Sequence, residues 1–299
     1  PRFVTLSGVP VQPAVVTVTY FSGDHLVTFL RSLDAVTDVM PQVIIADNGS
    51  DDGAPERAEQ EYDTVTLVRT GGNIGYGAGM NAGVEALRDR RAAGEIDGEF
   101  VLISNPDVVF DPGSIDEMVA AARRHPTAGA VGPLIREVDG SVYPSARSIP
   151  TLGAGIGHAL LAPVWKNNPF TRRYLADSVM DTERTSGWLS GSCQLLRWEA
   201  FDDIGGFDER YFMYLEDVDL GDRFTRAGYQ NIFCPEAVIS HAKGHSTQAH
   251  AGAMLRAHHN SAYRFQADRH PGRWQAPLRG ALWLGLRVRG LIASASARS

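Results

Sequence analysis

Short runs of β-branched and aliphatic residues alternate with stretches of helical periodicity through roughly the first 130 residues. This alternation restricts the fold more than any other feature, because strands that alternate with helices form a mainly parallel sheet flanked by helices. The runs that predict strands lie at residues 15–20, 43–46, 64–68 and 99–104. Apolar residues at helical spacing predict helices at residues 26–36, 54–62 and 111–125, the last with Ser114 as its cap. We therefore expect an α/β fold.

The pattern changes after about residue 130. Apolar segments at residues 134–138 and 142–146 flank Asp139-Gly140, which is a strong signal for a two-residue hairpin turn. Residues 151–185 contain glycines and prolines and few periodic positions, so we expect a mobile region that serves as a lid or as a dimer contact.

Polar residues follow the first two predicted strands, and in a parallel sheet ligands bind beyond the carboxyl ends of the strands. These residues are Tyr20 and the segment Asp47-Asn48-Gly49-Ser50. A nucleotide needs a flat surface beside its base and an acceptor for the polar groups of base or ribose. Tyr20 and Asp47 could supply both, although the segment that begins at Asp47 is, on its own, typical of a turn that caps a helix.

A glycine-rich loop, residues 72–77, follows the third predicted strand. Its likeness to the dinucleotide fingerprint of dehydrogenases is superficial, because the last glycine is missing and the loop does not follow the first strand. We therefore disfavour a dehydrogenase. The small residues instead let Asn73 and the following helix approach a nucleotide diphosphate closely.

Candidate metal ligands follow a further strand. Asn105-Pro106-Asp107 presents an amide oxygen and a carboxylate, which suits Mg²⁺ or Mn²⁺ bound to a diphosphate, although turn chemistry explains the triplet equally well. His241 follows the strand-like residues 237–240 and is a candidate further ligand, while a lone histidine is more often structural.

An acidic run, residues 216–219, begins another predicted helix and follows the aromatic-rich residues 211–214. Carboxylates at a helix start often only complement the helix dipole. Among aromatic neighbours, however, the carboxylate of Asp217 is a credible general base.

Charge and cysteine content narrow the class of protein. The net charge of −7 argues against a partner nucleic acid, yet residues 245–299 carry eight arginines and one aspartate. Cys193 and Cys234 are the only cysteines, which excludes a disulfide framework and a cysteine zinc site and fits a reducing cytosol. We expect neither a secretory signal nor a transmembrane helix, because no suitable uncharged apolar stretch occurs.

The basic tail contains an apolar stretch, residues 278–292, which is interrupted by arginines and accompanied by Trp274 and Trp283. This composition suits a helix that lies in a membrane interface. A helix that packs on the protein surface is the alternative.

In their order and spacing these motifs resemble those of the family-two glycosyltransferases with the GT-A fold, and among them the mycobacterial rhamnosyltransferases. The resemblance implies an N-terminal segment (1–12) and a catalytic domain (13–245). The catalytic domain would comprise a nucleotide-sugar half (13–130) and an acceptor half (131–245). A basic helical extension (246–299) would follow.

The resemblance also implies a role for each motif. Asp217 would be the catalytic base of a single displacement that inverts the anomeric centre. The nucleotide sugar would be bound by Tyr20, Asp47, Asn73, Gly75, Asn105 and Asp107. The acceptor would be bound by Gly191, Ser192, Cys193 and Glu216. Asp107 and His241 would hold a divalent cation, Mg²⁺ or Mn²⁺, that exchanges easily, because Asn105 stands where the family usually has an aspartate.

The substrates implied by the resemblance are dTDP-rhamnose and a polyprenyl-diphosphate-linked N-acetylglucosamine, in assembly of the linker between arabinogalactan and peptidoglycan. Such an acceptor implies a cytoplasmic protein that binds peripherally to the anionic inner face of the plasma membrane through residues 256–299. The oligomeric state is not determined by these motifs, and a homo-oligomer is one possibility. The alternatives are another nucleotide sugar or a non-catalytic nucleotide-sugar-binding module. A nucleotidyltransferase is disfavoured, since residues 20–30 contain no Lys or Arg.

Overall fold

The computed structural model describes residues 12–152, 180–241 and 251–296. Within these residues the strands form a ten-stranded sheet and a separate two-stranded sheet. Along the large sheet lie β3 (Val65–Arg69), β2 (Val43–Asp47), β1 (Ala14–Thr19), β4 (Phe100–Ser104), β11 (Cys193–Arg197), β6 (Ala128–Glu137), β12 (Gln230–His241) and β5 (Val108–Phe110). β7 (Val142–Tyr143) pairs with β6 and β9 (Arg184–Ser186) with β12, while β8 (Ala146–Arg147) and β10 (Trp188–Leu189) form the small sheet.

The strands β1 to β4 run parallel, as the sequence predicts, and their carboxyl ends meet at one edge of the sheet. We call this the carboxyl edge. β11 runs antiparallel between β4 and β6, and Cys193 at its start lies opposite Ser104 at the end of β4. The turn that precedes β11 therefore lies at the carboxyl edge too.

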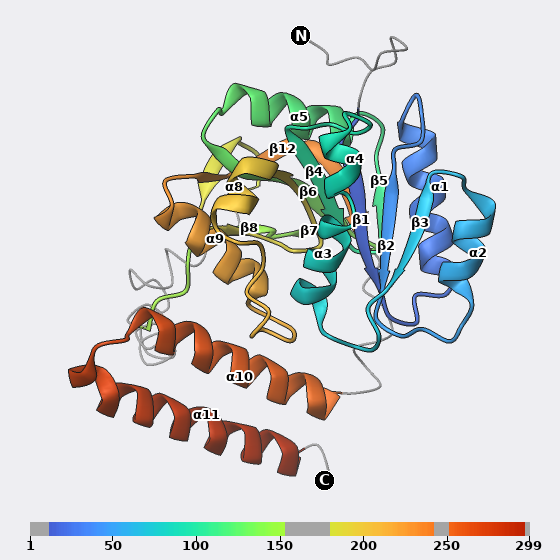
Figure 1. Ribbon diagram of the computed structural model, residues 1–299. Helices are drawn as coiled ribbons and strands as arrows, with labels where there is room; N and C mark the ends of the chain where they lie inside the picture. Colours follow the sequence, from blue (N-terminus) through green and yellow to red (C-terminus); the bar gives the residue numbers. More distant parts are fainter. Residues whose placement is uncertain (1–11, 153–179, 242–250, 297–299) are drawn as a thin grey trace.

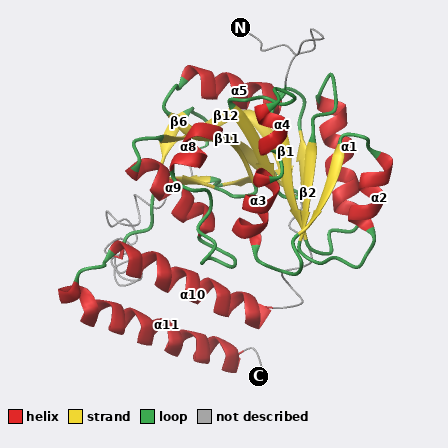
Figure 2. Ribbon diagram, in the orientation of Figure 1, coloured by secondary structure: helices red, strands yellow, loops and turns green. Residues whose placement is uncertain are grey.

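Helices cover both faces of the large sheet (Figures 1 and 2). Packed on one face are α1 (Asp24–Val36), α2 (Ala54–Glu61) and α5 (Ser114–Arg124). On the opposite face are α3 (Tyr76–Glu85), α8 (Trp198–Asp203) and α9 (Glu216–Arg226), and the short α4 (Arg88–Ala92) follows α3. Successive strand residues point to opposite faces of the sheet. Val15 therefore packs in the core under α1, α2 and α5, and Val16 packs in the core under α3, α8 and α9.

A hairpin is present around Asp139-Gly140, as predicted, but the predicted two-residue turn was wrong. The Glu137 amide donates to the Ser141 carbonyl at 2.8 Å, so the loop has three residues, 138–140, and Gly140 takes the left-handed conformation (φ of 81°) that such a loop requires at its last residue. Ile135 of β6 pairs with Tyr143 of β7, and the amide of Gly140 donates a hydrogen bond to the carbonyl of Glu137 at 2.9 Å. The predicted mobile region of residues 151–185 falls mostly on residues 153–179, which lie outside the described part of the chain.

Ser114 does not cap α5, so that prediction was wrong. Gly113, with φ of 82°, occupies the N-cap position, and Ser114 is the first helical residue. From there its buried hydroxyl makes no capping hydrogen bond to the first turn, because an N-cap side chain must stand one residue earlier.

The C-terminal extension is helical, as expected. It comprises α10 (Ala251–Arg269), a short 3₁₀ turn η2 (Arg273–Gln275) and α11 (Ala276–Ser296). The two helices lie antiparallel beside the α/β domain, and α10 is the inner one (Figure 1). None of the helices in the described residues has the length and hydropathy needed to cross a membrane.

Candidate active site

Most of the residues predicted to bind substrate lie along the carboxyl edge of the sheet. Tyr20 and Asn105 lie in the loops after β1 and β4, Asp47 is the last residue of β2, and Gly191 lies in the turn before β11. The fold therefore brings together segments that are far apart in the sequence, as the predicted parallel sheet requires.

Asp47 shapes the loop that follows β2. Its carboxylate accepts hydrogen bonds from the Thr19 hydroxyl at 2.8 Å and from the amides of Gly49 and Ser50 at 3.1 and 3.0 Å. Burial alone would raise the pKa of Asp47, but hydrogen bonds from Ser50, Thr19 and Gly49 hold it below its usual value. The side chain is 0% exposed, so its contact with a nucleotide base stays a prediction.

Sequence reasoning missed Arg69, the last residue of β3. Its guanidinium donates to Oδ2 of Asp47 at 2.6 Å and also pairs with Glu56, and its side chain remains 45% exposed. The signal in the sequence that could have indicated Arg69 was a cation at the end of a predicted strand, shortly before the glycine-rich loop. The Arg69 guanidinium offsets the charge of Asp47, the residue predicted to contact the nucleotide base.

Two aromatic rings stand exposed beyond β1. The Tyr20 and Phe21 ring centroids are 4.7 Å apart in an edge-to-face arrangement, and Tyr20 is 40% exposed. Phe21 has a positive φ of 55°, and its amide donates a hydrogen bond to the Ser50 hydroxyl at 2.9 Å. These contacts hold two exposed aromatic rings at the carboxyl edge, which suits the predicted contact between Tyr20 and a base.

The glycine-rich loop is held against the rest of the edge by its backbone. The Asn73 side chain accepts a hydrogen bond from the Gly75 amide at 3.2 Å, and the Asn48 amide group donates to the Gly75 carbonyl at 3.0 Å. Gly75 has φ of 92°, and a Cβ there would lie 2.3 Å from the carbonyl oxygen of Phe212. Only glycine fits this close approach without a shift of backbone.

Asp107 and His241, the two predicted metal ligands, are joined by a hydrogen bond between their side chains. Oδ1 of Asp107 and Nε2 of His241 are 3.0 Å apart, because β5 pairs with the end of β12. Two ligand atoms at right angles and about 2.1 Å from one ion lie about 3 Å apart, so this pair fits a divalent cation. Asn105 lies in the same loop as Asp107, and the backbone N–H of Asn105 donates a hydrogen bond to the Ser192 carbonyl at 2.8 Å.

A second group of potential ligands lies elsewhere in the described residues, at Glu183, Cys234 and Glu236. Glu183 is already paired with Arg124 and with His125, the latter at 2.8 Å. Burial raises the pKa of Cys234 to about 11, which disfavours the thiolate that binds a metal. The Asp107–His241 pair is therefore the better candidate.

Asp217 stands in the first turn of α9 and faces the turn before β11. Its Oδ2 accepts the Gly191 amide at 2.9 Å, and its Oδ1 accepts the Val218 amide at 2.8 Å. Burial raises the pKa of Asp217, while these amides work in the opposite direction. A fixed carboxylate whose pKa is raised is suited to accept a proton.

Glu216 lies beside Asp217 and is buried. Burial and the neighbouring Asp217 raise the pKa of Glu216 to about 8, and its Oε2 has no hydrogen-bond partner within the described residues. Burial, with Glu216 and Asp217 close by, also raises the pKa of Tyr76, whose hydroxyl donates to the Gly191 carbonyl. The site therefore concentrates carboxyl groups where few charges can be solvated.

The remaining predicted acceptor residues lie next to Gly191. The Ser192 and Ser190 hydroxyl oxygens are 3.0 Å apart. Cys193 is buried in β11, and burial raises its pKa to about 12. The Cys193 side chain packs in the core. A part in acceptor binding stays a prediction for Ser192 and for Cys193.

A family model described as "Glycosyltransferase like family 2" matches residues 12–260. The chain belongs to this family. The glycosyltransferase is 50% identical to N-acetylglucosaminyl-diphospho-decaprenol L-rhamnosyltransferase of Mycobacterium tuberculosis over 95% of this chain and 94% of that protein. It is 26% identical to rhamnosyltransferase WbbL of Escherichia coli over 85% of this chain and 92% of that protein.

Solved structures support the GT-A fold of this glycosyltransferase. The mannosyltransferase PcManGT of Pyrobaculum calidifontis, solved with GDP-Man and Mn²⁺, aligns over 100% of this chain and 79% of that chain, with a TM-score of 0.56 and 18% identity. The first 349 residues of TarS from S. aureus align over 93% of this chain and 80% of that chain, with a TM-score of 0.53 and 15% identity. At such identities the likeness is one of fold.

Proposed function

We propose that this glycosyltransferase transfers L-rhamnose from dTDP-rhamnose to N-acetylglucosamine linked to a polyprenyl diphosphate, in assembly of the arabinogalactan linker. The observation that carries the proposal is the 50% identity to the Mycobacterium tuberculosis rhamnosyltransferase, which extends over nearly the full length of both chains. Identity of this extent covers both the donor and the acceptor half of the site.

The transfer forms a bond between an acceptor oxygen and the anomeric carbon, and breaks the bond from that carbon to the nucleotide diphosphate. The bonding electron pair leaves with the diphosphate, and the proton of the acceptor hydroxyl passes to the carboxylate of Asp217. Attack on the face opposite the leaving group inverts the anomeric centre. The two amides that hold Asp217 fix the direction from which it can take the proton.

The donor would lie along the carboxyl edge, with its base near Tyr20 and Asp47 and its diphosphate near Asn73, Gly75 and the Asn105–Asp107 loop. Asp107 and His241 would hold Mg²⁺ or Mn²⁺ when it binds with the donor, and the ion would offset negative charge on the leaving diphosphate. Gly191, Ser192, Cys193 and Glu216 would border the acceptor.

The C-terminal helices support a peripheral position at the cytoplasmic face of the membrane. α11 and the turn before it expose large apolar side chains to solvent, namely Trp274, Leu278, Trp283, Leu284 and Val288. No acidic residue occurs between Arg269 and Arg287, and the Arg287 guanidinium lies 5.2 Å from the centre of the Trp283 ring. Exposed apolar side chains beside arginines suit the interface of an anionic bilayer, where a lipid-linked acceptor resides.

Calorimetric titration with dTDP-rhamnose, UDP-galactose and NAD, each with and without Mn²⁺, tests the donor. We expect binding of dTDP-rhamnose that depends on Mn²⁺. A preference for UDP-galactose would keep the fold and the mechanism and reject the donor, whereas binding of NAD alone would reject the proposal.

A further inference from the structure

The turn formed by residues 212–215, directly before Glu216 and the proposed base Asp217, has a strained backbone. Tyr214 and Leu215 have positive φ angles of 68° and 64°, directly before Glu216 and Asp217. Residues with a Cβ rarely adopt this left-handed region, which glycine adopts freely. Two such residues in succession persist only where surrounding contacts hold them in place.

One set of contacts comes from the glycine-rich loop. Tyr76 is the first residue of α3, and its backbone N–H donates a hydrogen bond to the carbonyl of Phe212 at 3.1 Å. The close approach of Gly75 to the same carbonyl leaves little room for the turn to move in that direction. The turn is thus supported from the nucleotide-sugar half of the site.

The other set of contacts comes from α10, outside the α/β domain. Ser261 is 5% exposed, and its hydroxyl donates a hydrogen bond to the carbonyl of Met213 at 2.9 Å. The ring of His258, one turn earlier in α10, meets the Tyr214 ring edge to face, with centroids 5.6 Å apart. Both contacts fall on the residues that enter the strained turn.

Apolar packing fixes α10 beside the same turn. Phe265 lies one turn after Ser261 and is buried against Tyr211 and Val218, which lie on either side of the turn in the sequence. Leu215 packs against this cluster as well. Because the cluster spans α10, the turn and α9, these three elements hold one another in register.

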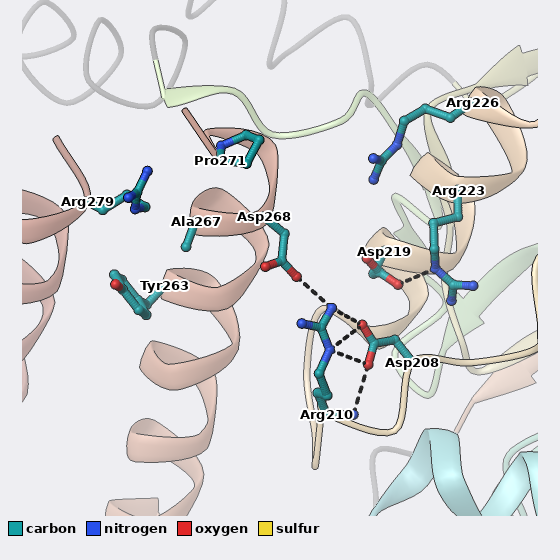
Figure 3. Close-up of a pocket in the computed structure, with 10 residues that line it drawn as sticks. All are labelled: Asp208, Arg210, Asp219, Arg223, Arg226, Tyr263, Ala267, Asp268, Pro271 and Arg279. Atoms are coloured by element: carbon teal, nitrogen blue, oxygen red, sulfur yellow. Dashed lines mark hydrogen bonds and ion pairs between the residues drawn. The ribbon is translucent and has the colours of Figure 1, made fainter. Parts of the chain in front are cut away.

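Ion pairs complete the attachment of α10. Arg210 bridges Asp208, at 2.6 Å, and Asp268 of α10, at 2.7 Å (Figure 3). Arg269 pairs with Asp222 of α9. These pairs join α10 to the residues before the turn and to the helix after it.

We propose that Ser261 is a positioning residue for glycosyl transfer, because its hydroxyl holds the strained turn that presents Asp217 to the acceptor. The inference rests on the proposed role of Asp217 as base. It gives the C-terminal extension a part in catalysis that is separate from membrane binding. α10 also packs against α11, so one helix joins the active-site turn to the proposed membrane surface.

The test compares Ser261→Ala with Ser261→Thr, which keeps a hydroxyl on the same carbon. Gln266→Ala is the matched control, because it removes another α10 hydrogen bond, from Nε2 to the Pro150 carbonyl at 3.1 Å, away from the turn. Loss of the hydrogen bond in Ser261→Ala should lower kcat about three- to tenfold without change in the Kd for dTDP-rhamnose. The Thr variant should recover kcat, and the Gln266 variant should keep it.

Hydrogen exchange of the amides of residues 213–218 gives a readout that needs no turnover. Exchange should rise in Ser261→Ala and return in Ser261→Thr. Unchanged exchange and kcat in Ser261→Ala, or an equal fall of kcat in Gln266→Ala, would overturn the inference. If Asp217→Asn turns over normally, the assigned base is wrong, and the exchange data still decide whether Ser261 holds the turn.

Discussion

The backbone N–H of Gly191 donates a hydrogen bond to Oδ2 of Asp217 at 2.9 Å and so joins the turn before β11 to the start of α9. This bond orients one carboxylate oxygen, while the Val218 amide orients the other. The turn before β11 and the proposed base therefore form one unit.

The pKa of Glu216 predicts how stability depends on pH. Its folded-state pKa is raised from 4.5 to about 8 by burial and by Asp217. The folded state then binds the proton more tightly than the unfolded state, so the contribution is fully present below pH 4.5 and is lost as the pH rises through about 8. In Glu216→Gln, the free energy of unfolding, measured with urea across this range, should fall less steeply with pH. Exposed Glu199→Gln is the control, and identical pH slopes for all three proteins would refute the assignment.

The Asp107–His241 pair predicts the metal dependence of donor binding. Chelation should remove tight binding of dTDP-rhamnose, and added Mn²⁺ should restore it. His241→Ala should raise the Mn²⁺ concentration needed at least about tenfold, because one of two close ligands is lost. Titration calorimetry at several Mn²⁺ concentrations measures this. Glu236→Gln, in the group of Glu183, Cys234 and Glu236, should need the same Mn²⁺ concentration as the native protein. If Glu236→Gln raises the Mn²⁺ concentration needed and His241→Ala does not, the ion binds at that group and the assignment to Asp107 and His241 is refuted.

Gly75 and Gly71 form a matched pair for the close approach at the glycine-rich loop. Both have positive φ, and Gly75 also has ψ of 171°, so alanine at either costs about 1–3 kcal/mol of backbone strain. Only at Gly75 does the added Cβ meet the Phe212 carbonyl, which should cost about 1–3 kcal/mol more. Urea unfolding of Gly75→Ala and Gly71→Ala measures the difference, and equal losses would show that the approach is not constrained.

The exposed apolar side chains of α11 predict membrane binding. Leu284→Glu and Val288→Glu should each lower binding to anionic vesicles roughly tenfold or more, because each removes an apolar side chain from the interface. Co-sedimentation with vesicles with and without anionic lipid measures this. Val138, 83% exposed in the hairpin, is the matched control as Val138→Glu. If all three substitutions act alike, α11 is not the contact surface.

Local patterns predicted much of this fold because their causes are local. Alternation and helical spacing located β1 to β4 and the start of α9, and Asp139-Gly140 located a hairpin. The shared edge of parallel strands also predicted that the loops after β1, β2, β3 and β4 lie together.

Contacts between distant segments were beyond sequence reasoning. Nothing in residues 193–197 indicates that β11 inserts antiparallel between β4 and β6, although this places Gly191 on Asp217. The Arg69–Asp47 pair and the contact of Ser261 with Met213 likewise depend on tertiary packing. The error at Ser114 has a different, local cause, because the adjacent Gly113, in a left-handed conformation, took the N-cap position.

The rate of rhamnose transfer by Asp217→Asn shows whether Asp217 is the base. Asparagine keeps the size of the side chain and an oxygen for the Gly191 amide, but cannot take up the acceptor proton. Transfer from dTDP-rhamnose to lipid-linked N-acetylglucosamine should fall about 10²- to 10⁴-fold, while the Kd for dTDP-rhamnose stays at the native value. Native turnover in Asp217→Asn would contradict the account.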